Sequence, residues 1–249
     1  MLTVALIGPD GSGKSTISER LQTELGLPVR SIYMGVNLHK SNVVLPHMRL
    51  VATLRRRGRG DDLEVASDIE NFKPAPTTLP RRALASVRSG LRLANWLAEE
   101  SYRLWIARRD TRRGRVVIFD RHFFADFFAS DIAADGASRP LARRIHGFML
   151  LHVFPKPDLV ICLDAPAEVL YARKPEGTLE RVQRKREESL AALTALPHTV
   201  LIDATRPPDE IVSEVATAVR SLYELRRQER RSDHRFLARA LGPVRGRRS

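Results

Sequence analysis

The chain has 249 residues, enough for one sizeable hydrophobic core, and its hydrophobic (43%) and charged (29%) fractions are ordinary for a globular protein. Its formal charge of +13 comes almost entirely from arginine, which indicates either a coding bias or anionic ligands such as nucleotides. Cys162 is the only cysteine, which excludes an intrachain disulfide, and its apolar neighbours predict a buried structural thiol. No apolar stretch approaches the length of a membrane span, and the N-terminus does not resemble a signal peptide, so we expect a cytoplasmic protein.

The predicted strands and helices alternate along the chain. Continuous apolar runs predict buried strands at 2–7, 29–34, 116–119, 159–163 and 199–202. Apolar residues at helical spacing predict helices at 14–25, 81–108, 123–130, 138–152, 166–173, 178–195 and 208–227. In the helix at 81–108, this spacing places Trp96 and Trp105 in the core. The alternation predicts an α/β fold, in which a parallel sheet is covered by helices on both faces.

Two segments differ in composition from this α/β pattern. Residues 35–80 contain a basic, an acidic and a proline-rich stretch, and we interpret them as a mobile insert of loop and short helix. Residues 226–249 hold nine arginines and few apolar residues, so we expect a poorly ordered basic tail. The tail is either a solvated extension or a weak contact for an anionic surface, without specific recognition of nucleic acid. The remaining domain spans residues 1–225.

A phosphate-binding motif follows the first predicted strand. Residues 8–16 read Gly-Pro-Asp-Gly-Ser-Gly-Lys-Ser-Thr and match the pattern G-x-x-x-x-G-K-[ST], between a buried strand and a helix. The glycines let the backbone curl until its N–H groups point at phosphate oxygens, and the N-terminus of the helix adds a partial positive charge. The residues predicted to bind ATP are Gly8, Asp10, Gly11, Ser12, Gly13, Lys14, Ser15 and Thr16. Among them, Lys14 is suited to the β- and γ-phosphates and Ser15 to Mg²⁺. The motif in this context predicts a P-loop NTPase fold, and a coincidental glycine turn is the alternative.

The strand at 116–119 ends in a second group of candidate residues, Asp120-Arg121-His122. A GTPase should carry an Asn-Lys-x-Asp motif, which is absent, and a motor ATPase should carry Asp-Glu at this strand end. Ligands of parallel sheets bind at the carboxyl ends of the strands. At that position Asp120 is suited to hold Mg²⁺ through water or to accept a proton. Arg121 is suited to neutralise the transferring phosphoryl group or to bind an acceptor phosphate, and an ordinary ion pair is the alternative.

The segment 173–186 is rich in cations and is broken by Pro175 and Gly177. Phosphoryl transfer needs cations that close over the phosphates, so we interpret this segment as a lid in which Arg173, Arg181 and Arg184 contact phosphate. The alternative is a solvated basic helix face whose arginines pair with neighbouring glutamates.

These three elements, in this order, resemble the thymidylate kinase family of nucleoside monophosphate kinases over residues 1–225. The similarity includes the loop at 8–16, the residues Asp120-Arg121-His122, the segment 157–168 and the segment 201–204. The resemblance implies a five-stranded parallel sheet, Mg-ATP as the phosphoryl donor and, often, a homodimer. It also implies that Asp10 faces the acceptor sugar or the metal, and that Arg121 binds the acceptor phosphate.

The acceptor-binding region departs from the family pattern. Tyr33-Met-Gly-Val-Asn-Leu-His39 stands where the family carries an Arg-Glu-Pro-Gly-Gly type of segment, and His122 replaces the usual Tyr or Phe. We therefore expect a phosphotransferase that uses Mg-ATP, with two alternatives for its acceptor. These are a nucleoside monophosphate such as dTMP, or a nucleoside, sugar or other small alcohol. A nucleotide-binding regulatory protein is the third hypothesis, but a pure switch has no need for Asp120, Arg121 and an arginine lid together.

Overall fold

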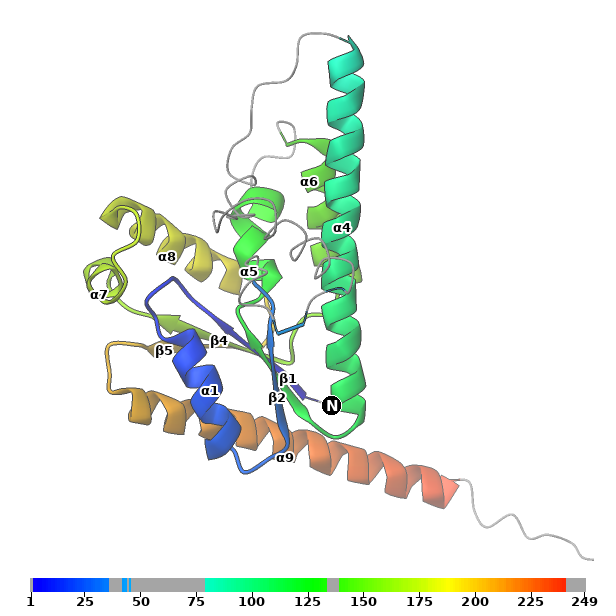
Figure 1. Ribbon diagram of the computed structural model, residues 1–249. Helices are drawn as coiled ribbons and strands as arrows, with labels where there is room; N and C mark the ends of the chain where they lie inside the picture. Colours follow the sequence, from blue (N-terminus) through cyan, green and yellow to red (C-terminus); the bar gives the residue numbers. More distant parts are fainter. Residues whose placement is uncertain (1, 36–41, 44, 46–78, 134–138, 241–249) are drawn as a thin grey trace, which may run out of the picture.

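A five-stranded parallel sheet forms the centre of the computed structural model (Figure 1). The strands are β1 (Leu2–Ile7), β2 (Val29–Tyr33), β3 (Val116–Asp120), β4 (Leu159–Asp164) and β5 (Thr199–Asp203), in the spatial order β2-β3-β1-β4-β5. The structure describes residues 2–35, 42, 43, 45, 79–133 and 139–240, with the backbone alone for 79–86, 88 and 230–240. Most of the insert expected at 35–80 therefore lies outside the described residues. Each pair of neighbouring strands is parallel, which confirms the predicted sheet.

Side chains of each central strand alternate between the two faces of the sheet, because successive residues of a strand point in opposite directions. Val4 and Leu6 of β1 lie in one apolar cluster, and Ala5 and Ile7 lie in the other. Cys162 of β4 is fully buried in the second cluster, as its apolar neighbours predicted. The first cluster includes residues of α1 (Lys14–Glu24) and α9 (Pro208–Ala240), and the second includes residues of α4 (Leu79–Arg112), α5 (Phe123–Phe127) and α8 (Leu179–Leu193). Helices thus cover both faces, which confirms the α/β class.

The order of the strands creates a crevice at the carboxyl ends of β1 and β4. The connection after β1 leads through α1 to β2 on one side of the sheet. The connection after β4 leads through α7 (Ala167–Arg173) and α8 to β5 on the other side. Adjacent strands whose connections leave in opposite directions open a crevice, and ligands of parallel α/β sheets bind there. The loop at 8–13, which follows β1, lies at this edge.

Two of the predicted helices are divided. The helix expected at 123–130 ends as α5 and continues as the π-helix η1 (Phe128–Ala133). The helix expected at 138–152 divides into α6 (Leu141–Phe148) and the π-helix η2 (Met149–Val153). Gly147 in α6 passes so close to η1 that a Cβ there would collide with the carbonyl oxygen of Asp131. Apolar periodicity over five or six residues does not separate a π-helical turn from an α-helical one, so the sequence predicted only the helices themselves.

The prediction that both tryptophans of α4 lie in the core is wrong for Trp105. The C-terminal part of this long helix packs against the sheet, through residues such as Leu104 and Ala107. Trp105 is 55% exposed and stacks on Tyr102, with ring centroids 6.1 Å apart. Trp96 is half-buried. Helical spacing identifies one face of a helix, but the sheet beneath it decides how much of that face is covered.

The C-terminal helix is longer than predicted. α9 continues through the expected boundary at residue 225 to Ala240, while 241–249 lie outside the described residues. That the tail is poorly ordered stays a prediction. Arg226 donates a hydrogen bond to the carboxylate of Asp158 at 3.0 Å, which ties the start of this segment to the domain. Arginine, glutamate and alanine are good helix formers, so a charged composition limits burial without preventing a helix. Neither α9 nor any other helix in the described part of the chain combines the length and the apolar character that a membrane span needs.

Candidate functional site

The loop between β1 and α1 has a shape that only its glycines permit. Gly8, Gly11 and Gly13 adopt φ angles of +136°, +85° and +89°, which residues with a Cβ rarely enter. A Cβ at Gly8 would collide with the carbonyl oxygen of Leu163 in β4, and a Cβ at Gly11 would lie 2.6 Å from the carbonyl oxygen of Leu170 in α7. The loop therefore packs closely against the neighbouring strand and helix, which positions the residues that follow it.

Lys14, the first residue of α1, folds back across this loop. Its side chain is buried, and its Nζ donates hydrogen bonds to the carbonyl oxygen of Pro9 at 2.6 Å and to Ser12 Oγ at 3.3 Å. Burial lowers the pKa of Lys14 to about 8, with a further contribution from the charge of Arg121 and against the attraction of Asp10. Among the described residues, no carboxylate forms an ion pair with this ammonium group, so a bound anion would stabilise its charge.

The second residue of α1, Ser15, meets the end of β3. Ser15 Oγ donates a hydrogen bond to Asp120 Oδ2 at 2.9 Å, although the two residues are 105 positions apart in the sequence. Oδ1 of Asp120 is buried and has no hydrogen-bond partner in the described part of the chain. A hydroxyl and a carboxylate are the kind of oxygen ligands that Mg²⁺ takes from a protein when phosphates supply the others. Thr16, the last residue of the motif, is exposed on the first turn of α1.

Arg121, directly after β3, has a strained backbone beside the loop. Its φ of +66° lies in the left-handed region, and its N–H donates to the carbonyl oxygen of Leu6 in β1 at 3.1 Å. Its guanidinium forms an ion pair with Asp10, which joins the end of β3 to the glycine-rich loop. Burial acts against the charge of Arg121, but the carboxylates of Asp126 and Asp10 outweigh it and raise its pKa. Burial also acts against the charge of Asp10, but Arg121 and Lys14 lower the pKa of this carboxyl.

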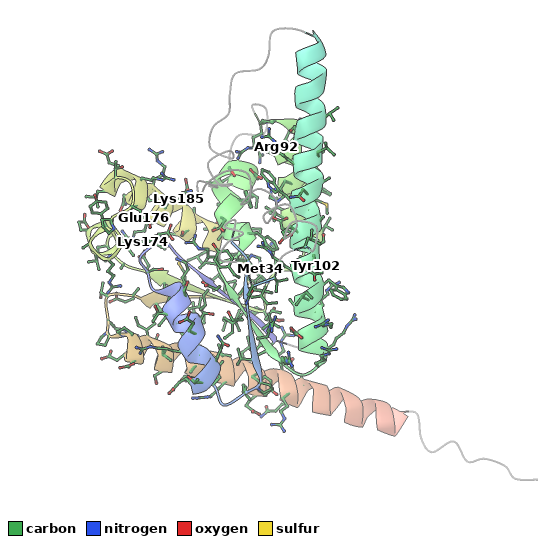
Figure 2. All side chains as sticks on the ribbon, viewed as in Figure 1. Met34, Arg92, Tyr102, Lys174, Glu176 and Lys185 are labelled. Atoms are coloured by element: carbon green, nitrogen blue, oxygen red, sulfur yellow. The ribbon has the colours of Figure 1, made fainter. Side chains whose placement is uncertain are left out.

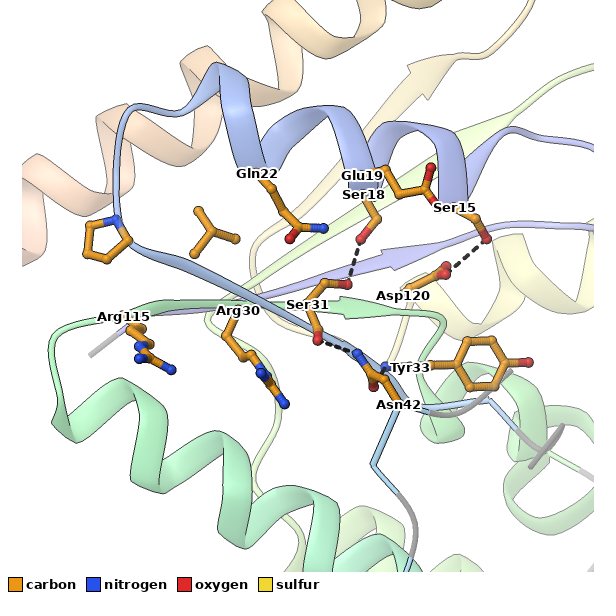
Figure 3. Close-up of a pocket in the computed structure, with 12 residues that line it drawn as sticks. Ser15, Ser18, Glu19, Gln22, Arg30, Ser31, Tyr33, Asn42, Arg115 and Asp120 are labelled. Atoms are coloured by element: carbon orange, nitrogen blue, oxygen red, sulfur yellow. Dashed lines mark hydrogen bonds between the residues drawn. The ribbon is translucent and has the colours of Figure 1, made fainter. Parts of the chain in front are cut away.

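An open groove of about 660 Å³ leads away from Ser15 and Asp120 along the outer edge of β2 (Figure 3). Side chains of α1 line one wall, and Arg30 and Arg115 lie on the other. The lining residues that carry hydroxyl or amide groups are Ser15, Ser18, Gln22, Ser31, Tyr33 and Asn42. This lining suits a polar ligand better than an apolar one.

The three arginines predicted for the lid have different surroundings. Arg173 donates from Nη1 to the carbonyl oxygen of Ala204, just after β5, at 2.8 Å. Arg181 and Arg184 are exposed and line a separate cavity of about 340 Å³ on α8. That these arginines bind phosphate stays a prediction.

Other cations of the same segment lie against the carboxyl ends of the strands. Lys174 Nζ is 3.9 Å from Asp10 Oδ1 and 2.9 Å from Glu176, and Figure 2 shows these lysine and glutamate side chains at the connection between α7 and α8. Arg186 forms two hydrogen bonds with the carboxylate of Asp164 at the end of β4, at 2.7 and 2.8 Å. The sequence identified a cation-rich segment, but the packing of α8 decides which of its cations face the sheet.

Asp126 was not among the predicted site residues. It lies half-buried in the first turn of α5, whose start is capped by His122: Nδ1 of this histidine accepts a hydrogen bond from the N–H of Phe124 at 3.3 Å. Burial lowers the pKa of His122 to about 3, so the cap is neutral. Burial raises the pKa of Asp126, although Arg121 and Lys14 act in the opposite direction. The only signal in the sequence is an acidic residue in a first helical turn, and that pattern usually indicates helix stabilisation.

A buried ion pair of α4 also reaches this edge of the sheet. Arg103 and Glu99 lie 2.9 Å apart, and Arg103 Nη1 donates to the carbonyl oxygen of Gly35, just after β2, at 3.0 Å. Glu99 Oε2 accepts a hydrogen bond from the N–H of Leu45 at 3.2 Å. The pair therefore holds parts of the segment after β2 against α4. Its spacing along α4 is common among exposed helix pairs, so the sequence did not distinguish it.

No protein-family model matches this chain, and a search of curated proteins found no match. The resemblance to the thymidylate kinase family thus stays a prediction from the motifs. The function has to be inferred from the chemistry of the site.

Proposed function

We propose that this protein is an ATP-dependent phosphotransferase of the P-loop kinase type, which transfers the γ-phosphoryl group of Mg-ATP to a small acceptor. The hydrogen bond between Ser15 and Asp120 supports this proposal most strongly. It joins the glycine-rich loop to the end of β3 and leaves one buried oxygen of Asp120 without a partner. A divalent cation held by this pair would satisfy that oxygen, either directly or through water.

The contacts of the neighbouring residues suggest a role for each. The backbone of residues 8–13 and the N-terminus of α1 would bind the phosphates, as such loops do in other nucleotide-binding proteins. Lys14 would exchange the carbonyl oxygen of Pro9 for phosphate oxygens, which restores the charge that burial disfavours. Arg121 would leave Asp10 to neutralise the transferred group, since its guanidinium stays protonated. Bound ATP would supply the phosphoryl group, and these cations would stabilise the charge that develops during transfer.

Two observations bear on the acceptor. The motifs that resemble the thymidylate kinase family favour a nucleoside monophosphate. The groove that begins at Ser15 is lined by hydroxyl and amide groups, which favours a hydroxylated molecule.

A substitution of Ser15 tests the proposed donor site. Purified protein should bind ATP more tightly with Mg²⁺ than without it in calorimetry, and should release ADP when a suitable acceptor is present. We expect Ser15→Ala to weaken the Mg²⁺-dependent part of ATP binding about tenfold, roughly 1.4 kcal/mol. Ser213→Ala removes an exposed hydroxyl from α9 and should leave it unchanged. A protein that binds no ATP, or that releases no ADP with any acceptor in a panel of nucleoside monophosphates, nucleosides and sugars, would contradict the proposal.

A further inference from the structure

Asp126 differs from the other carboxylates around the glycine-rich loop. Those carboxylates have partners: Asp10 pairs with Arg121, Asp120 with Ser15, Asp164 with Arg186, and Glu176 with Lys174. The N–H of Asp126 donates to the carbonyl oxygen of His122 at 3.2 Å, but its carboxylate has no hydrogen bond and no ion pair within 4 Å among the described residues. Its carboxylate is therefore available to a bound molecule.

The packing of α5 directs Asp126 away from the core. Phe123, Phe124 and Phe127 of this helix are buried against the sheet, whereas Asp126 is half-buried. The carboxylate is close enough to Lys14 for each to affect the pKa of the other. Asp126 therefore belongs to the same charged site as the lysine of the predicted phosphate loop.

The charged groups around Asp126 come from each element that surrounds it. Lys14 of α1, Arg121 after β3 and Lys185 of α8 attract its charge, and Asp10 of the loop repels it. Burial outweighs the attraction and raises the pKa of Asp126. A carboxylate with a raised pKa is a stronger base than an ordinary aspartate, and general bases work best when their pKa approaches the working pH.

We infer that Asp126 accepts the proton of a neutral hydroxyl group, and that the phosphoryl acceptor is an alcohol, such as a nucleoside or a sugar, instead of a phosphate monoester. The inference rests on the proposed phosphotransferase function. A phosphate monoester carries about −1.5 to −2 charges at neutral pH and attacks without losing a proton. An alcohol must lose its proton as it attacks. A carboxylate without a partner assists the alcohol and repels the phosphate.

The balance of charge around the site supports the same class of acceptor. Cations do not outnumber carboxylates among the described residues of the site; the cations are Lys14, Arg121, Lys174, Lys185 and Arg186, and the carboxylates are Asp10, Asp120, Asp126, Asp164, Glu176 and Glu188. ATP brings further negative charge even when Mg²⁺ accompanies it. A second phosphate would find no surplus of positive charge among these side chains, whereas an alcohol needs none.

The far wall of the groove does not supply the missing cations. Arg30 and Arg115 share the buried carboxylate of Asp110, at 3.8 and 3.4 Å, and Glu19 of α1 lines the same groove, so two carboxylates offset the two arginines. The part of the groove next to Asp120 is lined by the serines Ser15, Ser18 and Ser31, and Figure 3 shows the hydrogen bond between the hydroxyl groups of Ser18 and Ser31. Hydroxyl groups of this kind suit a hydroxylated ligand.

The proposed step balances in protons and electrons. The acceptor hydroxyl gives its proton to a carboxylate oxygen of Asp126, and its oxygen forms a bond to the γ-phosphorus with a lone pair. The bond from the γ-phosphorus to the β–γ bridging oxygen breaks, and its electron pair stays on ADP. Asp126 then releases the proton to solvent, so one proton is produced for each phosphoryl group transferred.

Asp126→Asn tests the inference, because it removes the base and keeps the shape of the side chain. A panel of nucleosides and sugars should contain an acceptor that the wild type phosphorylates. On that acceptor we expect kcat of Asp126→Asn to fall by about 10²–10⁴, and the acidic limb of the pH profile of kcat to disappear. Affinity for a non-hydrolysable ATP analogue, measured by calorimetry, should stay within about threefold of the wild type. Asp209→Asn, an exposed carboxylate of α9, should behave as the wild type does.

A second measurement does not depend on activity. The ¹³C resonance of the Asp126 carboxyl, identified by its loss in Asp126→Asn, should titrate above the ordinary aspartate pKa of about 3.9 in the protein without substrate. Titration at or below that value would overturn the role of Asp126. Phosphorylation of nucleoside monophosphates alone, or an unchanged kcat in Asp126→Asn, would overturn the inference and leave the proposed function standing. Loss of ATP binding by the wild type would instead contradict the proposed function.

Discussion

Two of the charged clusters in the described part of the chain differ in character, one around Lys14 and one around His146. In the second cluster, the imidazole of His146 in α6 is fully buried between two carboxylates. Nδ1 lies 2.6 Å from Asp131 Oδ2 in η1, and Nε2 lies 3.1 Å from both carboxylate oxygens of Glu100 in α4. Burial acts against the positive charge of His146, but the hydrogen bonds to Asp131 and Glu100 raise its pKa to about 9. This cluster satisfies its own charges and joins three helices.

The cluster around Lys14 has the opposite character. Burial lowers the pKa of Lys14 to about 8, and the attraction of carboxylates such as Asp10 does not offset it. Among the described residues, no carboxylate forms an ion pair with its ammonium group. One oxygen of Asp120 is buried without a partner, and the carboxylate of Asp126 has none within 4 Å in the described part of the chain. A shifted pKa therefore does not by itself identify a site. The folded state favours the charged form of His146 and disfavours the charged forms of Lys14 and Asp126, so a bound ligand would stabilise the latter two.

Replacement of His146 should cause the largest loss of stability. In His146→Gln the positive charge disappears, and Asp131 and Glu100 stay buried without it. Removing one partner from a buried ion pair typically costs about 3–5 kcal/mol, and we expect a loss of this size in urea denaturation. His152→Gln on η2 is the control, since His152 is exposed, and should change the free energy of unfolding by less than about 0.5 kcal/mol. Equal stabilities for the two variants would contradict a structural role for the His146 cluster.

Replacement of Lys14 should affect function and not the fold. Lys14→Met keeps the length of the side chain and removes its charge, so we expect phosphoryl transfer to fall by about 10²–10³, or 3–4 kcal/mol. The folded state disfavours the charge of Lys14, since its pKa is lowered, and the melting temperature should stay the same or rise. Lys156→Met, at an exposed lysine, is the matched control for activity. A clear fall in melting temperature for Lys14→Met would place Lys14 among the residues that hold the fold.

The pH dependence of stability should come from the His146 cluster. The pKa of His146 is about 9 in the folded protein and about 6.5 in an unfolded chain, so folding favours the protonated form. This stabilisation is complete below pH 6.5 and is lost as the pH rises through about 9. The free energy of unfolding of the wild type should fall by an amount on the order of 3 kcal/mol between pH 6.5 and 9.5. The free energy of unfolding of His146→Gln should not fall in this way. An equal fall in both proteins would show that titratable groups other than His146 cause the pH dependence.

Replacement of Arg143 should cause the smallest loss of stability, because this residue lies at the edge of the His146 cluster. Its Nη1 is 3.1 Å from Asp131 Oδ1, but its side chain is 23% exposed and solvent screens the charge. We expect Arg143→Gln to lower the free energy of unfolding by about 1 kcal/mol or less. Arg144→Gln, at an exposed position of the same helix, serves as the control. A loss as large as that of His146→Gln would show that Arg143 compensates the buried carboxylates.

The first part of the fold and the shape of the glycine-rich loop could be predicted from the sequence because their contacts are local. The predicted strand at 2–7 and helix at 14–25 agree with β1 (Leu2–Ile7) and α1 (Lys14–Glu24) to within one residue. The glycines of the loop take the positive φ angles that favour glycine over other residues. Alternating strands and helices also predicted a parallel sheet, since that sheet is the usual solution for such a chain.

Only the tertiary structure decided which distant side chains share the site. Ser15 meets Asp120 because β1 and β3 are neighbours in the sheet, although β2 and α4 lie between them in the chain. The charges of Asp126 and Lys14 act on each other because the phenylalanines of α5 pack against the sheet and leave Asp126 half-buried. The packing of α4 on the sheet leaves Trp105 exposed, and the packing of α8 determines which of its cations face the strands. Periodicity describes a helix face, but the rotation and depth at which that face is buried depend on contacts between segments far apart in the sequence.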